Sequence, residues 1–514
     1  MPIGRRDFLK GAAGLAAGAA LPARVAANLS GDQAAPRRPN ILVFLTDDHG
    51  HWLQGSYGNS EVRTPNLDRL ARRGVRMTNA STPSPVCSPA RASFFTGMFP
   101  SQHGIHDWIE ESTNAYASPW LEGQTLISER LRDSGYHTGL VGKWHCGFER
   151  EPRPGFDYWF SYWVSQYPHR GEQKFSDQGR QVIEQGQQSP LLTNHALDFL
   201  RQHRDDSATA GKPFFLCVGY VDTHGPHANA PDDLVAEYAD ATFRDIPQEE
   251  FSSAHGKASV TVNKDPAIER AKRQQYYAAA SSIDREMGRV IADLEAHGEL
   301  DNTLVVYTGD HGLNAGHHGV WEKGNITQPQ NFLDESIRVP CTISWPSGGL
   351  GRDVTSAVPV DHCDLHATLL DAAGLDAAGV TPSSRVSSPG RSYLPLLRGE
   401  RISDWRDAQI CEYGNARMIR TQDYKLIRRY PFKGVADSHE LYDLRSDPRE
   451  TANRYADPSL SGVIDALTDR LNAFFAKYEV AVHSGLSMED QPLPTPASPW
   501  LRKSSRSFNL ESRP

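Results

Sequence analysis

Apolar stretches that end abruptly in acidic residues, lysines and histidines recur along this chain. A continuous apolar run of about six residues predicts a strand buried on both faces, as in a parallel sheet. Predicted helices separate the runs, and this alternation indicates a mainly parallel sheet with helices on both faces. Polar residues that follow such strands gather along one edge, where open α/β sheets bind ligands. The runs are residues 40–45, 136–141, 213–220 and 303–307, and the polar residues that follow them are Asp47, Asp48, Lys143, His145, His224, Asp310 and His311.

The periodicity between these runs is helical, and the pattern changes near residue 385. Residues 232–265 are polar without periodicity and predict a long excursion from the sheet. Beyond the Gly/Ser/Pro-rich stretch 377–390, residues 416–420 and 424–428 predict two antiparallel strands across a turn. The predicted helices span residues 64–70, 125–134, 192–203, 268–296, 364–373 and 460–477, and further strands span 339–345 and 440–444.

The sequence therefore predicts an α/β fold with two folded domains. The larger, residues 36–385, is expected to be a mainly parallel or mixed sheet between layers of helices. The smaller, residues 386–488, is expected to be an antiparallel sheet with a helix. Residues 489–514 are rich in Pro and Ser and predict an extended tail or an oligomer contact.

The first 27 residues have the order basic, apolar, small that is typical of an export signal. Arg5 and Arg6 are followed by Phe-Leu-Lys and then by an Ala/Gly/Leu run over residues 11–21. The paired arginines indicate the twin-arginine route, which carries folded proteins, and the run is too short for a membrane span. We expect removal of residues 1–27 and a periplasmic or secreted product without a membrane span.

The mature chain is expected to be strongly acidic. Removal of residues 1–27 changes the formal net charge from −9 to −12. This charge excludes a global attraction to nucleic acid or other polyanions. An anionic substrate must therefore be drawn by a local cluster of positive charge.

Cys87 stands between prolines, with Arg91 four residues further on. Pro85 and Pro89 restrict the backbone on both sides and hold the side chain at the mouth of a turn. Pro89 also suits the first turn of a helix, whose free N–H groups and positive dipole end would face the cysteine. A cysteine taken alone is more often a packed thiol, but this segment predicts an anion site.

Three carboxylates at the ends of the predicted strands indicate a metal site. Asp47, Asp48 and Asp310 supply hard oxygen atoms, which favour Ca²⁺ or Mg²⁺ over softer metals. Without a cation, three converging carboxylates would repel one another and raise their pKa values. His311, the residue after Asp310, offers nitrogen, a poorer ligand for Ca²⁺ than oxygen.

The string Cys87-Ser88-Pro89-Ala90-Arg91 resembles the C-x-P-x-R signature of the type I sulfatases, a family of the alkaline-phosphatase-like superfamily. The resemblance implies an alkaline-phosphatase-like fold and one divalent cation, Ca²⁺ with Mg²⁺ and Mn²⁺ as alternatives. In that family a formylglycine-generating enzyme oxidises the cysteine to formylglycine. Five of the six cysteines would then remain, and they cannot all pair within one chain. The family's ligands and catalytic residues correspond to Asp47, Asp48, Cys87, Arg91, Lys143, His145, His224, Asp310, His311 and Lys323.

The resemblance also implies a role for each of these residues. The hydrated aldehyde at position 87 would attack sulfur, assisted by the metal and Asp310. His224 would protonate the departing alcohol, and His145 would take a proton from the second hydroxyl to expel sulfate. The remaining roles are stabilisation of the sulfate oxygens by Lys143 and Lys323, and holding of the hydrate by Arg91.

The substrate prediction rests on residues near the nucleophile and on export. His103, His106, Asp107 and Trp108 follow the predicted nucleophile helix and are candidates for substrate binding. Aromatic faces with polar groups suit a sugar sulfate ester, but such residues are as often part of a core. An aromatic-rich stretch offers Tyr158, Trp159, Tyr162, Trp163 and Tyr167. Export favours an extracellular sulfated glycan.

Two alternatives compete with a sulfuric ester hydrolase acting on a sulfated carbohydrate. Relatives with the same motif hydrolyse phosphorus esters, so a phosphonate monoester hydrolase or phosphodiesterase is the nearest. A non-catalytic glycan-binding protein, in which Cys87 is never oxidised, is the other. Every position expected of the active enzyme is filled, which favours the sulfatase.

Overall fold

The computed structural model describes residues 38–110, 117–118, 120–163, 168–251, 255–376, 387–434 and 438–501. These residues belong to one compact unit that begins at Arg38. The predicted signal peptide, Tyr167 and residues 502–514 of the predicted tail lie outside the described residues.

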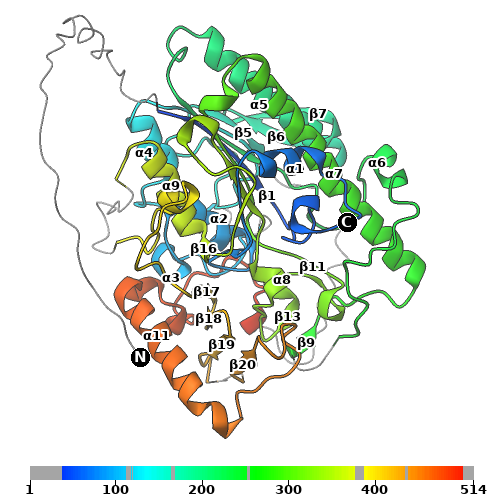
Figure 1. The fold of residues 1–514 in the computed structure, drawn as a ribbon, viewed down its shortest axis with the longest axis vertical. Helices are drawn as coiled ribbons and strands as arrows, with labels where there is room; N and C mark the ends of the chain where they lie inside the picture. Colours follow the sequence, from blue (N-terminus) through cyan, green and yellow to red (C-terminus); the bar gives the residue numbers. More distant parts are fainter. Residues whose placement is uncertain are drawn as a thin grey trace, which may run out of the picture. The chain divides into compact units, whose positions relative to one another are not determined.

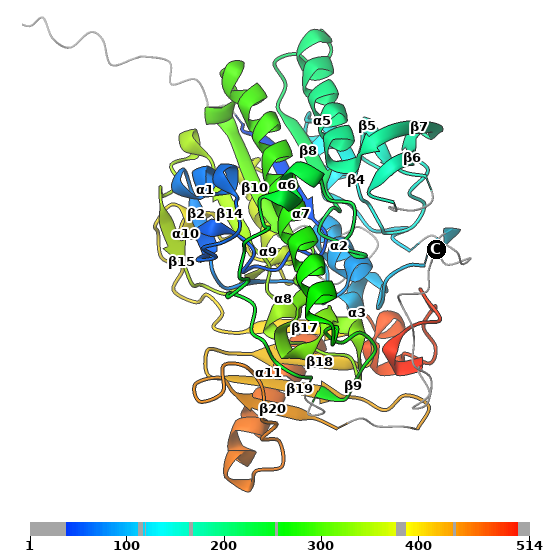
Figure 2. The same ribbon diagram turned by 90° about the vertical axis from the view of Figure 1, so that its right-hand side faces the viewer.

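A mixed sheet of ten strands runs through the described part of the chain (Figures 1 and 2). Its central strand, β1 (Asn40–Thr46), is parallel to β10 (Thr303–Gly309) on one side and to β8 (Phe214–Gly219) on the other. The strand order is β15-β2-β14-β10-β1-β8-β4-β5-β6-β7. The other strands are β2 (Val75–Met77), β4 (His137–Gly142), β5 (Tyr158–Tyr162), β6 (Arg170–Asp177), β7 (Arg180–Gln187), β14 (Cys341–Ser344) and β15 (Val354–Ser356).

Alternate residues of β1 face two separate hydrophobic cores. Ile41, Val43 and Leu45 join the core beneath α2, α4 and α9, whereas Leu42 and Phe44 join the core beneath α1, α5 and α7. Each of these five side chains is fully buried, which stabilises the fold by about 1.5–3 kcal/mol per residue. The predicted helix layers on both faces are therefore confirmed. The helices are α1 (Pro65–Arg72), α2 (Cys87–Thr96), α4 (Ile127–Asp133), α5 (Gln188–Asp205), α7 (Pro266–Ala296) and α9 (His362–Ala372).

Two parts of the sheet differ from the sequence-based expectation. Tyr158, Trp159 and Tyr162 belong to β5, and all three are buried, so the core interpretation of the aromatic-rich stretch is the right one for them. The hairpin of β6 and β7 was not expected, because its residues are largely polar. The excursion over residues 232–265 contains a short helix, α6 (Asp232–Ala236), and a short strand, β9 (Lys257–Ala258).

A second, antiparallel sheet follows in the C-terminal part, as predicted. It consists of β17 (Gln409–Tyr413), β18 (Ala416–Arg420), β19 (Tyr424–Arg429) and β20 (Glu440–Asp443), and α11 (Ser461–Tyr478) packs against it through Leu467, Leu471 and Phe475. Shorter elements are α3 (Pro100–His103), α8 (Asp334–Ile337), α10 (Leu394–Leu397) and the strand pairs β3 (Ala80–Ser81) with β16 (Val360–Asp361), β11 (Asn314–Ala315) with β12 (Trp321–Glu322), and β13 (Thr327–Gln328) with β9.

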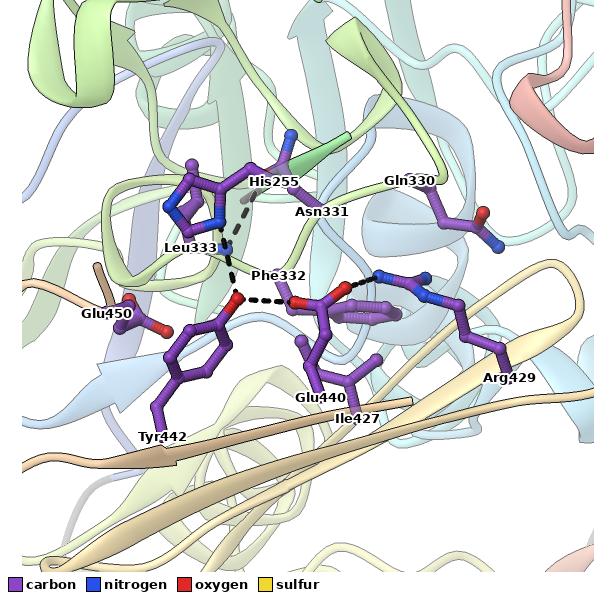
Figure 3. Close-up of a pocket in the computed structure, with 10 residues that line it drawn as sticks. All are labelled: His255, Gln330, Asn331, Phe332, Leu333, Ile427, Arg429, Glu440, Tyr442 and Glu450. Carbon is purple, nitrogen blue, oxygen red and sulfur yellow. Dashed lines mark hydrogen bonds and ion pairs between the residues drawn. The ribbon is translucent and has the colours of Figure 1, made fainter. Parts of the chain in front are cut away.

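Polar contacts join the small sheet to the segment that precedes α8. Lys425 of β19 donates to the carbonyl of Phe332 at 2.8 Å and to Asp334 Oδ1 at 2.7 Å, and it also contacts Glu450. Beside this ion cluster, a hydrogen-bonded chain runs from Arg429 through Glu440 and Tyr442 to His255 (Figure 3). The small sheet therefore holds the segment at residues 330–334.

Candidate functional site

The parallel strands bring the predicted site residues to one edge of the large sheet. Asp47 and Asp48 follow β1, and Asp310 follows its parallel neighbour β10. Lys143 follows β4, which pairs in parallel with β8 up to Gly142 and Gly219. Because the carboxyl ends of parallel strands meet at one edge, residues from these three distant segments converge on Cys87.

Cys87 is the first residue of α2 and is only 3% exposed. Its Sγ atom lies 3.2 Å from His311 Nε2, 3.3 Å from Lys323 Nζ and 3.5 Å from Asp47 Oδ1. Burial would raise the pKa of the thiol, but Lys143 and Lys323 outweigh it and hold the pKa well below its usual value. The environment of residue 87 therefore stabilises negative charge.

Cys87 and three neighbouring residues have the arrangement of a metal site. Asp47, Asp48, Cys87 and His311 each place one ligand atom within 4.8 Å of the others. Asp48 Oδ2 is buried and accepts no hydrogen bond, so this carboxylate has an oxygen available for a cation. Asp310 stands beside the group, with its Oδ1 3.4 Å from His311 Nε2. The carboxylate-rich donor set fits a hard divalent cation.

The carboxylates of this group are electrostatically unequal. Burial raises the pKa of Asp48 to about 6, although Lys323 and His224 oppose the increase. Burial also acts to raise the pKa of Asp47, but Lys143, His224 and Lys323 lower it below its usual value. Two buried lysines thus balance part of the negative charge at the strand ends.

Arg91 ties the nucleophile helix to three strand ends. Its side chain is fully buried, and Nε donates to Asp310 Oδ2 at 2.7 Å. Nη1 donates to the carbonyl of Lys143 at 2.8 Å, and Nη2 donates to that of Leu45 at 3.4 Å. These contacts fix Asp310 relative to Cys87, and the holding of a hydrate by Arg91 stays a prediction.

Lys143 and Lys323 approach residue 87 from two loops. Lys143 Nζ lies 2.5 Å from Asp47 Oδ2, and Lys323 Nζ contacts Asp48 Oδ1 as well as the cysteine. Burial alone would lower the pKa of both lysines. The negative charge of Asp47 beside Lys143, and that of Asp48 beside Lys323, outweighs burial, so both pKa values are raised. Both ammonium groups are therefore charged and buried, as the binding of an anion requires.

The two predicted catalytic histidines are held by their second ring nitrogen. His145 has a left-handed backbone, with φ of 58°, and its Nε2 lies 3.0 Å from the carbonyl of Ile109. His224 Nδ1 lies 2.9 Å from the carbonyl of Gly225, while its Nε2 lies 3.8 Å from Asp48 Oδ2. A carbonyl accepts only from N–H, so the proton sits on Nε2 of His145 and on Nδ1 of His224.

The sequence did not reveal several residues that hold the catalytic loops. Glu149 Oε1 accepts from the backbone N–H groups of Trp144 and His145 at 2.8 and 3.2 Å. Tyr276 donates to the carbonyl of Asp48 at 2.8 Å. Glu149 lies in a charged run typical of a surface loop, and Tyr276 lies in the middle of a long helix, so neither carries a motif.

The candidate substrate residues beyond α2 make contacts within the fold. His103 accepts from Ile105 N at 3.1 Å, and His106 Nε2 lies 2.7 Å from the carbonyl of His483. Asp107 accepts from Tyr413 at 2.8 Å, and half-buried Trp108 packs against a core cluster. Substrate binding by these four residues stays a prediction.

The fold and the site together define an alkaline-phosphatase-like hydrolase. The family model "Sulfatase" matches residues 39–375, and the model "N-sulphoglucosamine sulphohydrolase, C-terminal" matches residues 316–477. The chain belongs to the sulfatase family, and it is a sulfuric ester hydrolase.

Curated relatives match most of the chain. An N-acetylglucosamine-6-O-sulfatase of Bacteroides thetaiotaomicron is 29% identical over 498 residues, which cover 81% of this chain and 82% of the relative. An ulvan-active sulfatase of Formosa agariphila is 29% identical, covering 86% and 84%. A choline-sulfatase of Rhizobium meliloti is 28% identical, covering 85% of each chain.

Solved structures share the fold. A structure in complex with its substrate D-glucosamine-2-N,6-O-disulfate has a TM-score of 0.71 and 26% identity, covering 86% of this chain and 98% of the other. A phosphonate monoester hydrolase of Agrobacterium radiobacter has a TM-score of 0.64 and 21% identity, covering 85% and 96%. The second likeness concerns the fold alone.

The N-terminus matches the twin-arginine translocation signal sequence over residues 2–22. This match confirms the predicted export to the periplasm or beyond. Among the described residues, no helix is both long and apolar enough to cross a membrane.

Proposed function

We propose that this sulfatase removes sulfate from a sulfated carbohydrate outside the cytoplasm, with a formylglycine at position 87 and Ca²⁺ as its cation. The observation that carries the proposal is the environment of Cys87: Lys323 Nζ and His311 Nε2 both lie within 3.3 Å of its Sγ atom. Two relatives named for carbohydrate sulfates, and a related complex with a sulfated glucosamine, support the substrate class. The partner in maturation is a formylglycine-generating enzyme.

The cation would be held by Asp47, Asp48, residue 87 and His311, with Asp310 alongside. Carboxylate oxygens outnumber nitrogen in this set, which favours Ca²⁺ over softer metals. When bound, the cation supplies positive charge to the sulfate oxygens and to the attacking oxygen. The hydrate of formylglycine would supply that oxygen together with the second hydroxyl needed for release of sulfate.

The lysines orient the sulfate group. Lys143 and Lys323 reach the site from different loops, and both are at least 95% buried. Buried ammonium groups that are already fixed in place stabilise developing charge without reorganisation. Arg91 keeps Asp310 beside residue 87 through their 2.7 Å contact, so that Asp310 assists deprotonation of the nucleophile.

The two histidines divide the proton transfers. Burial and Lys323 lower the pKa of His224, but Asp48 and Asp47 outweigh them and raise it. Nδ1–H stays bonded to the carbonyl of Gly225, so Nε2 is the nitrogen that gains the second proton when the ring is charged and that protonates the departing alcohol. His145 donates Nε2–H to the carbonyl of Ile109, which leaves Nδ1 as the acceptor for the proton at residue 87.

A substrate panel tests the proposal. The mature protein, produced together with a maturation enzyme, is assayed with 4-nitrophenyl sulfate, N-acetylglucosamine 6-sulfate, choline sulfate and a phenylphosphonate monoester. We expect the highest kcat/KM with the sugar sulfate and loss of activity on chelation that Ca²⁺ restores. A preference for choline sulfate or for the phosphonate ester would contradict the substrate class.

Residue 87 is tested in the same series. The mass of its peptide should show an aldehyde in place of the thiol. Cys87→Ala should abolish turnover, whereas Cys363→Ala, which alters a fully buried cysteine outside the ligand group, should retain it. An unmodified thiol in a protein that still turns over would exclude formylglycine.

A further inference from the structure

The loop that carries Lys323 has an unfavourable backbone. Glu322, directly before the lysine, has φ of 80°. A non-glycine residue in this left-handed region is energetically unfavourable and persists only where surrounding contacts fix it. The same loop is pressed against the nucleophile segment, since Gly324 N donates to the carbonyl of Pro85 at 3.2 Å.

Two buried asparagines hold the carbonyls on both sides of this loop. Asn314 Nδ2 donates to the carbonyl of Glu322 at 2.9 Å, and Asn331 Nδ2 donates to that of Lys323 at 3.0 Å. The backbone N–H of Asn331 donates to the carbonyl of Gly324 at 3.0 Å. Three consecutive carbonyls, from residue 322 to residue 324, are thus fixed by two side chains and one amide.

Ser336 connects the two asparagines. Its Oγ accepts from Asn314 Nδ2 at 2.8 Å and donates to Asn331 Oδ1 at 2.8 Å. All three side chains are buried, with exposures of 0% for Asn314, 0% for Ser336 and 4% for Asn331. A buried polar network with its donors directed at one short loop specifies a single conformation of that loop.

The network also bridges two parts of the site. Asn314 opens β11, three residues after the metal-site residue His311, and Ser336 accepts from Gly312 N through its carbonyl at 3.1 Å. Asn331, drawn in Figure 3, lies in the segment that the small sheet holds. The position of the Lys323 ammonium therefore depends on backbone contacts from the segment that follows β10 and from the segment that the small sheet holds.

We propose that the Asn314–Ser336–Asn331 triad consists of positioning residues that set the place of the Lys323 ammonium and thereby the affinity of the site for the sulfate group. This inference rests on the proposed function, in which Lys323 binds sulfate oxygens. The triad touches the backbone of the loop and acts only through the lysine.

The test measures binding as well as turnover. Asn331→Asp keeps the Oδ1 acceptor but replaces the donating nitrogen with an oxygen that repels the carbonyl of Lys323. Asn59→Asp is the matched control, because Asn59 is 5% exposed and donates to Tyr277 at 3.0 Å, outside the site. Inorganic sulfate is titrated calorimetrically into the mature, calcium-loaded proteins, and KM is measured with 4-nitrophenyl sulfate.

We expect Asn331→Asp to weaken sulfate binding and raise KM on the order of tenfold, as for loss of one buried hydrogen bond, while Asn59→Asp changes both less than about twofold. If the triad had a merely structural role, both variants would have a lower melting temperature, but their affinity for sulfate would equal that of the wild-type protein. Lys323→Ala completes the series. If it weakens sulfate binding and Asn331→Asp does not, the triad has no positioning role. If Lys323→Ala leaves sulfate binding unchanged, the proposed role of the lysine fails and the inference fails with it.

Discussion

Replacing Arg91 by methionine should be among the most destabilising substitutions at the site. The side chains of Arg91 and Asp310 are both fully buried and lie 2.7 Å apart. Removal of one partner leaves an uncompensated buried charge, which costs about 3–5 kcal/mol. We therefore expect Arg91→Met to lower the free energy of unfolding by this amount at pH 7, measured by guanidinium denaturation of the metal-free protein.

A second substitution separates the charge from the packing. Arg91→Met/Asp310→Asn removes the orphaned carboxylate, so it should recover at least about half of the loss. Arg73→Met is the control, because the Arg73–Glu295 pair has exposures of 35% and 50%, and such pairs contribute about 0–1 kcal/mol. A loss below about 1 kcal/mol in Arg91→Met, or no recovery in the double variant, would refute the reasoning.

The penalty should also depend on pH. Burial and Asp47 raise the pKa of Asp310 already in the wild-type protein, and loss of Arg91 should raise it further. A carboxyl group whose pKa is higher in the folded than in the unfolded state destabilises the fold wherever it is ionised when unfolded. The cost of Arg91→Met should therefore shrink as the pH falls from 7 towards 4. A pH-independent cost would point to packing instead of charge.

Three further predictions concern other buried groups. Glu149→Ala, which removes the acceptor for His145 N, should lower kcat about tenfold or more, whereas Glu149→Gln retains an acceptor and should recover most of it; equal losses in steady-state assays would argue against positioning. Lys425→Met removes the ammonium group that Asp334 and Glu450 share. Asp334 keeps its pair with Arg420, but Glu450 loses its ion pair, so the free energy of unfolding measured with denaturant should fall by about 3–5 kcal/mol; an unchanged value would contradict this. Burial lowers the pKa of His366 to about 4, so protonation of this group favours the unfolded state. Below pH 6.5 the free energy of unfolding should therefore fall by about 1.4 kcal/mol for each pH unit down to pH 4. His366→Asn should flatten this part of the plot of stability against pH, and an unchanged slope would contradict the assignment.

The convergence of the proposed metal ligands and nucleophile could be predicted, because their positions follow from strand topology. Asp47, Asp48 and Asp310 lie directly after apolar runs, and parallel pairing of β1 with β10 in register brings the runs' ends together. Cys87 was recognisable from its prolines, which fix where α2 begins. In these cases a local pattern determines the position of the side chain.

The supporting residues could not be predicted, because their partners are distant backbone atoms. Glu149 binds N–H groups within its own loop, but a buried carboxylate in a charged run looks like a surface residue. The β6–β7 hairpin, Arg170–Asp177 and Arg180–Gln187, lies at the edge of the sheet, where strands need no apolar run. His106 and Asp107 were singled out for closeness in sequence to Cys87, although their contacts are set by His483 and Tyr413 in the C-terminal part.

The burial of Cys87 limits when another enzyme can modify this residue. In the folded chain the thiol is 3% exposed within the first turn of a fully buried helix, so another enzyme has no access to it. The twin-arginine route exports chains that have already folded. On the proposed function, conversion of residue 87 to formylglycine therefore has to act on the nascent or unfolded chain, before export. Folding would then bury the modified residue, so a molecule that folds with an unconverted cysteine would stay inactive.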